Sequence, residues 1–306
     1  MDLSGLLLVE KGQGVTSFQV VAYLRRLLGV HKIGHGGTLD PHATGLLPIL
    51  VGEGTKLTPF LAEQDKEYEV TLLLGVKTDT LDITGKVLEE LPVPALTRDA
   101  VQEILKRFVG EIAQVPPMFS ALHHRGRRLY ELARQGMTVE RPSRTVRIHA
   151  IELLDLAVPR LTLQIACGRG TYIRSLCADL GEALGCGATV ECLVRTRVGQ
   201  FTLAETIPWS ELIGLQDPRP LRDRLLPLEA ALQHLSSVVL PKGAVTAFCN
   251  GQAVPYDGVN SGQAYRIIGN DMFLGVGVGT AKDTLRPVRL FHAGPESSRR
   301  HPAERS

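Results

Sequence analysis

Asp40 is the only carboxylate in the glycine-rich stretch that spans residues 34–46. Pro41 follows it, and glycines stand at positions 34, 36, 37 and 45. Proline pushes the residue before it out of the helical region, and glycine lets another molecule approach the main chain closely. The pattern is therefore typical of an acid that is presented as a nucleophile to a bulky substrate. It is also compatible with a plain Asp-Pro turn between two core elements, and the spacing alone does not separate the two interpretations.

Two further groups of residues have side chains that could serve this carboxylate. Tyr172 and Arg174 stand two positions apart at the glycine-flanked start of a predicted helix. An arginine within hydrogen-bond distance of a carboxylate favours its ionised form, which a nucleophile requires. Tyr68 begins a predicted strand and offers an aromatic ring that could stack on a base, although a core tyrosine is the commoner use of such a position. The sequence alone does not bring these regions together.

The positive charge of the chain is concentrated in one segment. The formal net charge is only +2, yet residues 123–147 hold seven arginines and two glutamates, so this segment carries +5 and the remainder −3. Arginine binds phosphate through bidentate hydrogen bonds, so the segment suits a nucleic-acid backbone. Its composition favours a mobile arm that folds over a substrate, and a solvated charged helix and loop is the alternative. The expected phosphate-binding side chains are Arg125, Arg127, Arg128, Arg134, Arg141 and Arg144.

Length and composition exclude several classes of protein. A chain of 306 residues favours two domains, because single cores seldom grow beyond about 250 residues. The apolar run at residues 6–9 is far too short for a signal peptide or a membrane span, so we expect a cytoplasmic protein with no membrane partner. The five cysteines are odd in number and form no C-x-x-C pair, which argues against a zinc site and a disulfide framework.

The hydrophobic pattern mixes strands and helices without a strict repeat. Strands are predicted at residues 6–9, 68–74, 144–153, 161–167 and 190–201, and helices at 17–28, 97–110, 127–135 and 173–184. This mixture favours an α+β fold over a doubly wound parallel sheet.

The C-terminal part has a different pattern. Residues 237–292 are rich in valine and glycine, and turn signals divide them into short alternating runs, which is typical of a small all-β, barrel-like module. Residues 293–306 have no apolar periodicity, so a disordered tail is expected there.

Several motifs together resemble the TruB family of RNA pseudouridine synthases. The central one is Gly34-His-Gly-Gly-Thr-Leu-Asp-Pro-His-Ala-Thr-Gly-Leu-Leu-Pro48. The others, in family order, are Lys11-Gly-Gln-Gly-Val-Thr-Ser17, Gly52-Glu-Gly-Thr-Lys56, Lys66-Glu-Tyr68, Gly170-Thr-Tyr-Ile-Arg174 and Leu193-Val-Arg-Thr-Arg-Val-Gly199. The match covers residues from about 5 to 235, and the length resembles that of the bacterial stand-alone enzymes.

This resemblance implies a fold and a reaction. The fold would have a mixed, largely antiparallel central sheet flanked by helices in a catalytic domain of residues 1–236, followed by a PUA-like RNA-binding domain at 237–292. The reaction would convert uridine to pseudouridine at nucleotide 55, in the T-loop of tRNA. It consumes nothing, so neither a cofactor nor a metal is expected. The enzyme would bind the T-arm of tRNA as a monomer and require no protein partner.

The resemblance also assigns roles to single residues. Asp40 would attack the ribose C1′ or the base C6, Tyr68 would stack on the uracil and help remove its C5 proton, and Arg174 would pair with Asp40. The expected substrate-binding residues are His35, Tyr172, Leu193, Lys56 and Lys11. His35 would take the place left by the flipped nucleotide, and Leu193 would form an apolar wall. Residues 120–147 correspond to an RNA-clasping insertion, which makes the six arginines named above RNA-binding residues.

Two other function classes remain open from the residues themselves. A stand-alone RNA-binding protein would keep the arginine arm and the barrel but would not need Asp40. A hydrolase with an aspartate nucleophile, such as a glycosidase, would need a second carboxylate at a matching position. Two acids that follow the motif in sequence, Glu53 and, farther on, Asp65, have no motif around them.

Overall fold

The computed structural model of the protein describes residues 3–124 and 126–291. Its α-helices are α1 (Ser17–Leu28), α2 (Thr58–Glu63), α3 (Arg98–Lys106), α4 (Leu129–Arg134), α5 (Ile173–Ala183), α6 (Trp209–Gly214), α7 (Arg219–Asp223) and α8 (Lys242–Cys249), and its short 3₁₀ helices are η1 (Gly52–Leu57), η2 (Leu203–Glu205) and η3 (Leu228–Leu232). Its strands are β1 (Gly5–Lys11), β2 (Ile33–His35), β3 (Thr44–Val51), β4 (Lys66–Leu74), β5 (Val76–Thr78), β6 (Val87–Glu90), β7 (Gly110–Gln114), β8 (His123–His124), β9 (Arg127–Arg128), β10 (Arg144–Ala157), β11 (Arg160–Cys167), β12 (Ala188–Val198), β13 (Phe201–Thr202), β14 (Ile207–Pro208), β15 (Ser237–Val239), β16 (Val254–Pro255), β17 (Ala264–Gly269), β18 (Met272–Gly279) and β19 (Thr284–Leu290).

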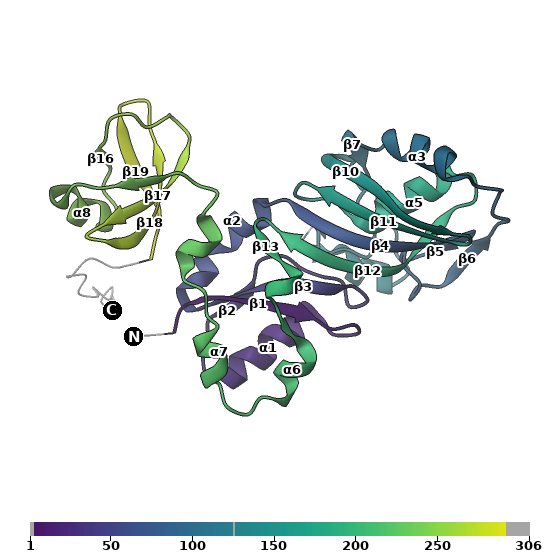
Figure 1. Ribbon diagram of the computed structural model, residues 1–306, viewed down its shortest axis with the longest axis horizontal. Helices are drawn as coiled ribbons and strands as arrows, with labels where there is room; N and C mark the ends of the chain where they lie inside the picture. The colour runs from purple at the N-terminus through teal and green to yellow at the C-terminus, as the bar shows by residue number, and fades with distance from the viewer. Residues whose placement is uncertain (1–2, 125, 292–306) are drawn as a thin grey trace, which may run out of the picture.

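A large sheet forms the centre of the main body (Figure 1). Its strands run in the order β14-β1-β3-β12-β4-β11-β10-β7, with β2 beside β3 and β13 beside β12. Within the described residues, the β1–β14 and β3–β12 pairs of this sheet are parallel and its other pairs are antiparallel. The predicted α+β fold with a mixed, largely antiparallel central sheet is confirmed.

The central strands are apolar on both faces because both faces are covered. In β1, Leu7 and Val9 belong to one core, whereas Leu6 and Leu8 point into another, as the two-residue period of a strand requires. The first core contains side chains of α1, α3 and α5, and the second contains side chains of α2 and η3. Figure 1 shows α1, α6 and α7 gathered at one end of the sheet and α3 and α5 at the other.

Two helices illustrate how local signals and tertiary contacts compete. α1 begins after Thr16, as predicted, and the Thr16 side chain accepts from the Gln19 N–H. The helix ends at Gly29, which has the left-handed conformation (φ 66°). The helix predicted at 97–110 begins as expected after Thr97 but ends at Lys106. The reason is that Gly110 already starts β7, where it pairs with Ile148 of β10.

The C-terminal module is built on a second sheet with the order β15-β17-β18-β19-β16. Val245 and Phe248 of α8 pack into its core, and this helix was missed from the sequence because a glycine and β-branched residues weaken its helical signal. Val276 and Phe291 of the module share the second core of the main body with Leu61. The module is therefore attached through buried apolar contacts. The tail predicted to be disordered, 293–306, lies outside the described residues.

The arginine-rich arm has a small core of its own. The strands β8 and β9 form a hairpin that leads into α4, and Met118, Leu129 and Leu132 are buried together. Among the described residues, no helix combines the length and the apolar character needed to cross a membrane.

Candidate active site

The Asp40 loop lies between β2 and β3 and is fastened to the loop that precedes α1. The Ser17 hydroxyl donates to the Leu39 carbonyl oxygen at 3.1 Å and accepts from the Leu39 N–H at 3.0 Å. The Gly14 N–H donates to the Pro41 carbonyl oxygen at 2.8 Å. Because both neighbours of Asp40 are held, its carboxylate is presented from a fixed backbone.

Two buried cations support the same loop from the interior. Arg195 is 2 % exposed, and its guanidinium donates to the carbonyl oxygens of Leu46 at 2.8 Å and Gly37 at 3.1 Å. Lys11 is 0 % exposed and donates to the Pro41 carbonyl oxygen at 3.3 Å. Both side chains therefore hold the main chain of the loop: Lys11 at the residue that follows Asp40, and Arg195 at Gly37 and Leu46 on either side of it.

Gly45 shows why the loop needs glycine. Its φ is 101°, which side chains rarely adopt, and a Cβ at this position would lie 2.4 Å from the Arg195 carbonyl oxygen. The parallel pairing of β3 with β12 places Gly45 opposite Arg195. The glycine therefore permits the strand contact that brings Arg195 under the loop.

Arg174, the last residue of the Gly170–Arg174 motif, reaches Asp40 from α5. Its Nε lies 2.9 Å from Asp40 Oδ2, and the Arg174 side chain is 6 % exposed against 38 % for Asp40. Its other donors are also engaged: Nη1 donates to the Thr80 carbonyl oxygen and Nη2 to the Phe119 carbonyl oxygen, both at 2.7 Å. The rigid fork of the guanidinium thus holds one end of the carboxylate from a buried position.

Asp82 is a residue of this network that sequence reasoning missed. Its Oδ2 lies 3.4 Å from Arg174 Nη1, its side chain is 7 % exposed, and its Oδ1 accepts from the Thr84 N–H at 3.0 Å. Leu81, just before it, has a left-handed backbone (φ 64°), which is uncommon for a leucine and marks a constrained turn. The only available signal was the alternation of Thr and Asp around residues 79–84, which also occurs in ordinary turns.

A cavity of about 250 Å³ opens beside the ion pair. Asp40, Tyr68, Tyr172, Arg174 and Leu193 all line it, so five of the eight catalytic and substrate-binding residues predicted from the sequence meet in one place. Burial raises the pKa of the Tyr68 phenol, and the neighbouring Arg195 guanidinium opposes the rise. Burial also raises the pKa of Tyr172. Both phenols therefore enter the cavity as neutral groups at ordinary pH.

Three protein-family models match successive segments of the chain. Residues 25–173 match the N-terminal domain of the TruB family pseudouridylate synthases, and residues 174–233 match the tRNA pseudouridylate synthase B C-terminal domain. Residues 236–291 match the C-terminal family "Pseudouridine synthase II TruB". The chain belongs to the TruB family. It is therefore a pseudouridine synthase, an isomerase, and the family predicted from its motifs is confirmed.

Relatives of known name match nearly the whole chain. The tRNA pseudouridine synthase B of Dehalococcoides mccartyi (strain CBDB1) is 41 % identical over 290 residues, which cover 94 % of this chain and 97 % of the relative. The protein of the same name from Moorella thermoacetica (strain ATCC 39073 / JCM 9320) is 48 % identical over 257 residues, or 83 % of this chain and 84 % of the relative.

Solved structures share the fold of this TruB protein. A chain in the crystal structure of a Cbf5-Nop10-Gar1 complex superimposes with a TM-score of 0.72 and 28 % identity, covering 94 % of this chain and 84 % of that one. A chain in the structure of an H/ACA RNP bound to a substrate RNA containing 2'-deoxyuridine gives a TM-score of 0.70 at 26 % identity, with coverages of 94 % and 85 %. The predicted pseudouridine synthase fold is confirmed by these neighbours.

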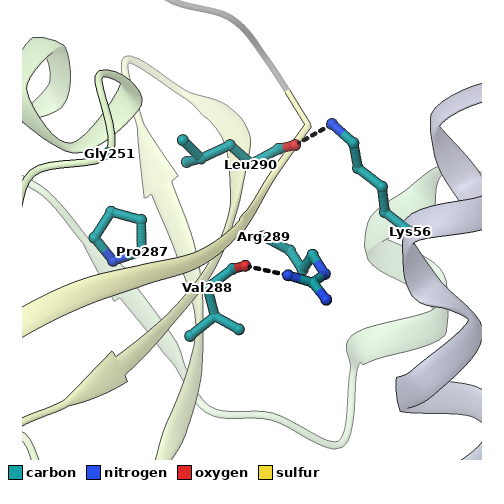
Figure 2. Close-up of a pocket in the computed structure, with 6 residues that line it drawn as sticks. All are labelled: Lys56, Gly251, Pro287, Val288, Arg289 and Leu290. Atoms are coloured by element: carbon teal, nitrogen blue, oxygen red, sulfur yellow. Dashed lines mark hydrogen bonds between the residues drawn. The ribbon is translucent and has the colours of Figure 1, made fainter.

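Three predicted substrate-binding residues of the TruB chain, His35, Lys56 and Lys11, do not line the cavity. His35 sits in β2, where its Nδ1 is buried without a hydrogen bond in the described structure, and burial lowers its pKa. Lys56 reaches across to the C-terminal module, where its Nζ donates to the Leu290 carbonyl oxygen at 2.7 Å (Figure 2). Lys56 and Arg289 line a cleft of about 470 Å³ between the module and the main body.

The arm arginines occupy three settings. Arg127 and Arg128 are exposed on β9, and Arg134 is exposed at the end of α4, where it lies over the Tyr130 ring. Arg141 is half-buried and donates to the Pro116 carbonyl oxygen at 3.0 Å. Arg144 is exposed at the start of β10, close enough to lower the pKa of Tyr172 against the effect of burial. Arg125 lies outside the described residues.

The described residues contain no cluster of three or more His, Cys, Asp or Glu side chains that could hold a metal ion.

Lys11 is predicted from the sequence to bind substrate, but the structure places its ammonium group against main-chain carbonyls. Besides Pro41, it donates to the carbonyl oxygens of Gly12 at 2.9 Å and Val15 at 2.7 Å. Burial lowers the pKa of Lys11 from 10.5 to about 8, and attraction to Asp40 opposes this shift. The lysine therefore positions the Asp40 loop and carries a charge that burial disfavours.

This pKa predicts a pH-dependent stability difference between the wild type and Lys11→Met. Between about pH 8 and 10.5, the unfolded chain binds the Lys11 proton and the folded chain does not, so stability rises with pH only where the lysine is present. The wild type should gain up to about 1.4 kcal/mol of unfolding free energy per pH unit over the variant. Urea unfolding from pH 7.5 to 10.5 measures this. Lys282→Met, at an exposed lysine, is the matched control. A difference between wild type and Lys11→Met that stays constant with pH would contradict the prediction.

Proposed function

We propose that this protein converts uridine to pseudouridine at nucleotide 55 in the T-loop of tRNA, with Asp40 as the nucleophile and the target base flipped into the cavity. The observation that carries the proposal is the Asp40–Arg174 ion pair on the wall of that cavity. The tRNA substrate is supported by the names of the relatives that match nearly the whole chain.

The ion pair suits nucleophilic attack better than acid catalysis. Arg174 donates to one oxygen of Asp40 and favours the carboxylate over the neutral acid. A carboxylate can attack the ribose C1′ while the bond to N1 breaks and its electrons leave on the uracil, or it can add to C6 of the base. In either case the N1–C1′ bond breaks, and the detached uracil must turn until C5 faces C1′. The new C1′–C5 bond then forms, the carboxylate is released, and C5 loses a proton while N1 gains one, so no other reactant is consumed.

The cavity walls fit the needs of a free base. Its volume of about 250 Å³ lies below the 300–1,000 Å³ or so of pockets for drug-sized ligands, and so suits a single pyrimidine. Leu193 and Ile173 supply apolar surface, which helps to keep the uracil from escaping. Tyr68 offers a ring for stacking and a hydroxyl near the position where the C5 proton leaves. We place His35, outside the cavity, at the gap that the flipped nucleotide leaves in the RNA.

Flipping a base out of a folded loop costs a few kcal/mol, which contacts to the rest of the RNA must offset. We assign this task to the exposed arm arginines and to the C-terminal residues 237–292, taken as a PUA-like RNA-binding domain beside a catalytic domain of residues 1–236. Lys56 and Arg289, facing each other across the interdomain cleft, are candidates for phosphate contacts to the T-arm. As part of the same proposal, the enzyme acts as a cytoplasmic monomer without a protein partner.

A hydrolase function is less well supported by the site. Asp82 is a second carboxylate near Asp40, but it lies behind Arg174 and does not line the cavity. A glycosidase places both carboxyl groups on either side of the bond that it cleaves. The arrangement here, with one carboxylate facing the cavity and another buried on the arginine, favours isomerisation.

The test of the proposal is to incubate the protein with an unmodified tRNA transcript and map pseudouridine at single-nucleotide resolution. We expect one modified position, nucleotide 55, and none in a transcript with cytidine at that position. Absence of product, or product only at another nucleotide, would refute the proposal.

The arm should control tRNA affinity and its dependence on salt. Replacing Arg125, Arg127 and Arg128 with alanine removes up to three phosphate contacts, each worth about 0.7–0.9 in the slope of log affinity against log salt. We expect the slope to fall by about 2, and affinity to fall at least tenfold at low salt. Filter binding from 50 to 300 mM salt measures both. The matched control replaces Arg219, Arg222 and Arg224, which are exposed around α7; an arm variant that behaves like this control would argue against the arm's role.

A further inference from the structure

The segment that begins the arginine-rich arm, residues 119–121, is called its root here, and it forms one wall of the Asp40 cavity. Ser120 and Ala121 line the cavity, and β8, β9 and α4 follow them in the chain. The root is fixed at both ends. Arg174 Nη2 donates to the Phe119 carbonyl oxygen at 2.7 Å, and the Tyr130 N–H donates to the Ser120 carbonyl oxygen at 3.1 Å. Ser120 is therefore held on a wall that is tied to the catalytic arginine.

The hydroxyl of Ser120 is buried and unsatisfied. The residue is 5 % exposed, and its Oγ makes no hydrogen bond within the described residues. Buried polar groups are nearly always paired, and an unpaired one carries the full cost of its lost hydration. The Tyr172 phenol lies close enough for the Ser120 hydroxyl to oppose the rise that burial causes in the pKa of that phenol, but the two hydroxyls do not meet the geometry of a hydrogen bond.

Two other polar side chains on the cavity wall, Arg174 and Thr171, are already committed. Arg174 uses its donors on Asp40, Thr80, Asp82 and Phe119. The Thr171 hydroxyl donates to the Gly168 carbonyl oxygen at 3.0 Å. The Ser120 hydroxyl thus remains as a donor with free capacity beside the place where a base would lie.

We propose that the Ser120 hydroxyl donates a hydrogen bond to a carbonyl oxygen of the flipped uracil, and that Ser120 is a specificity residue of the base pocket. This inference rests on the proposed function. Uracil carries two carbonyl oxygens, O2 and O4, on either side of N3. A ligand carbonyl at this position supplies the partner that the buried hydroxyl lacks.

The chemistry of the isomerisation makes such a donor useful twice. A half-turn of uracil about the axis through N3 and C6 brings C5 to the place of N1 and at the same time exchanges O2 with O4. A donor fixed on the wall therefore meets one carbonyl before the turn and the other after it. Ser120 holds the free base in both orientations without moving, since a hydroxyl rotates to suit its acceptor.

Single-turnover kinetics with Ser120→Ala test the proposal. We expect the rate of pseudouridine formation to fall about tenfold to hundredfold, because a carbonyl is left buried and unpaired, while tRNA affinity stays within about twofold because it rests on phosphate contacts. Ser143→Ala, at an exposed serine of the same arm, is the matched control and should keep the wild-type rate. Thermal unfolding of each variant shows whether it is folded, and Ser120→Thr, which keeps the hydroxyl, should recover most of the rate.

Changing the base identifies the partner atom. Transcripts with 2-thiouridine or 4-thiouridine at the target position replace one carbonyl by a weaker acceptor, so the penalty of Ser120→Ala should shrink on at least one of them. The penalty should persist in a Tyr172→Phe background. A wild-type rate for Ser120→Ala, equal penalties on all three bases, or a penalty that vanishes with Tyr172→Phe would each overturn the proposal. Failure of the proposed function is distinct, because the wild type itself would then form no pseudouridine.

Discussion

Asp40→Asn is expected to abolish pseudouridine formation and to leave tRNA affinity within about tenfold of the wild type. The amide keeps the size of the carboxylate and can still accept from Arg174 Nε, which lies 2.9 Å from Asp40 Oδ2 in the wild type. It lacks the charged oxygen that attacks the substrate in the proposed reaction. Removal of a covalent nucleophile typically costs on the order of 10⁴-fold or more, because only binding and orientation remain.

Two measurements separate chemistry from binding in this variant. Product is followed over hours at saturating enzyme, and affinity is measured by filter binding to the same transcript. Asp217→Asn is the matched control. Asp217 is also partly exposed and also pairs with an arginine, Arg219, but it does not line the cavity. Measurable turnover by Asp40→Asn at a rate near that of the control would refute the role of Asp40.

The sequence could identify Asp40 because its signals are local. Glycines, a proline and a lone carboxylate within 13 residues restrict the backbone in ways that need no tertiary information. Tyr68, Tyr172 and Arg174 could be selected for the same reason, since each stands at the start of a strand or a helix. What the residues alone could not show is that these four positions meet, because β4, α5 and the Asp40 loop are brought together only by the order of strands in the sheet.

Arg195 and Asp82 could not be found from local signals. Arg195 acts through its side chain on the carbonyl oxygens of Gly37 and Leu46, more than a hundred residues earlier, and an arginine inside a strand is usually a surface residue. Asp82 is recognisable only once Arg174 is seen beside it. Lys11 shows the opposite case, because its motif could be identified from the sequence but its surroundings could not. The side chain is buried and donates to the carbonyl oxygens of Val15 and Pro41, so it supports the loop from inside the protein.

Arg174→Lys should be the most damaging conservative substitution in the chain. Arg174 serves acceptors in different directions: the Asp40 and Asp82 carboxylates and the carbonyl oxygens of Thr80 and Phe119. Lysine offers one compact ammonium group and cannot reach all of them. We expect the single-turnover rate to fall about 10²- to 10³-fold and the free energy of unfolding to fall by about 3–5 kcal/mol, the cost of breaking a buried ion pair.

The surface of the same protein provides the matched control. Arg160 pairs with Glu191 through the same fork, with Nε at 2.7 Å from Oε2 and Nη2 at 2.8 Å from Oε1, but its side chain is 55 % exposed. Arg160→Lys should therefore change the free energy of unfolding very little and leave the rate unchanged. Urea unfolding and single-turnover assays compare the two variants directly. If Arg174→Lys resembled Arg160→Lys in both assays, a positive charge near Asp40 would be enough for the rate and the stability, and the prediction would be wrong. A loss of rate and stability at Arg174 alone means that the Asp40 carboxylate depends on a planar, buried guanidinium, which also holds the root of the arm.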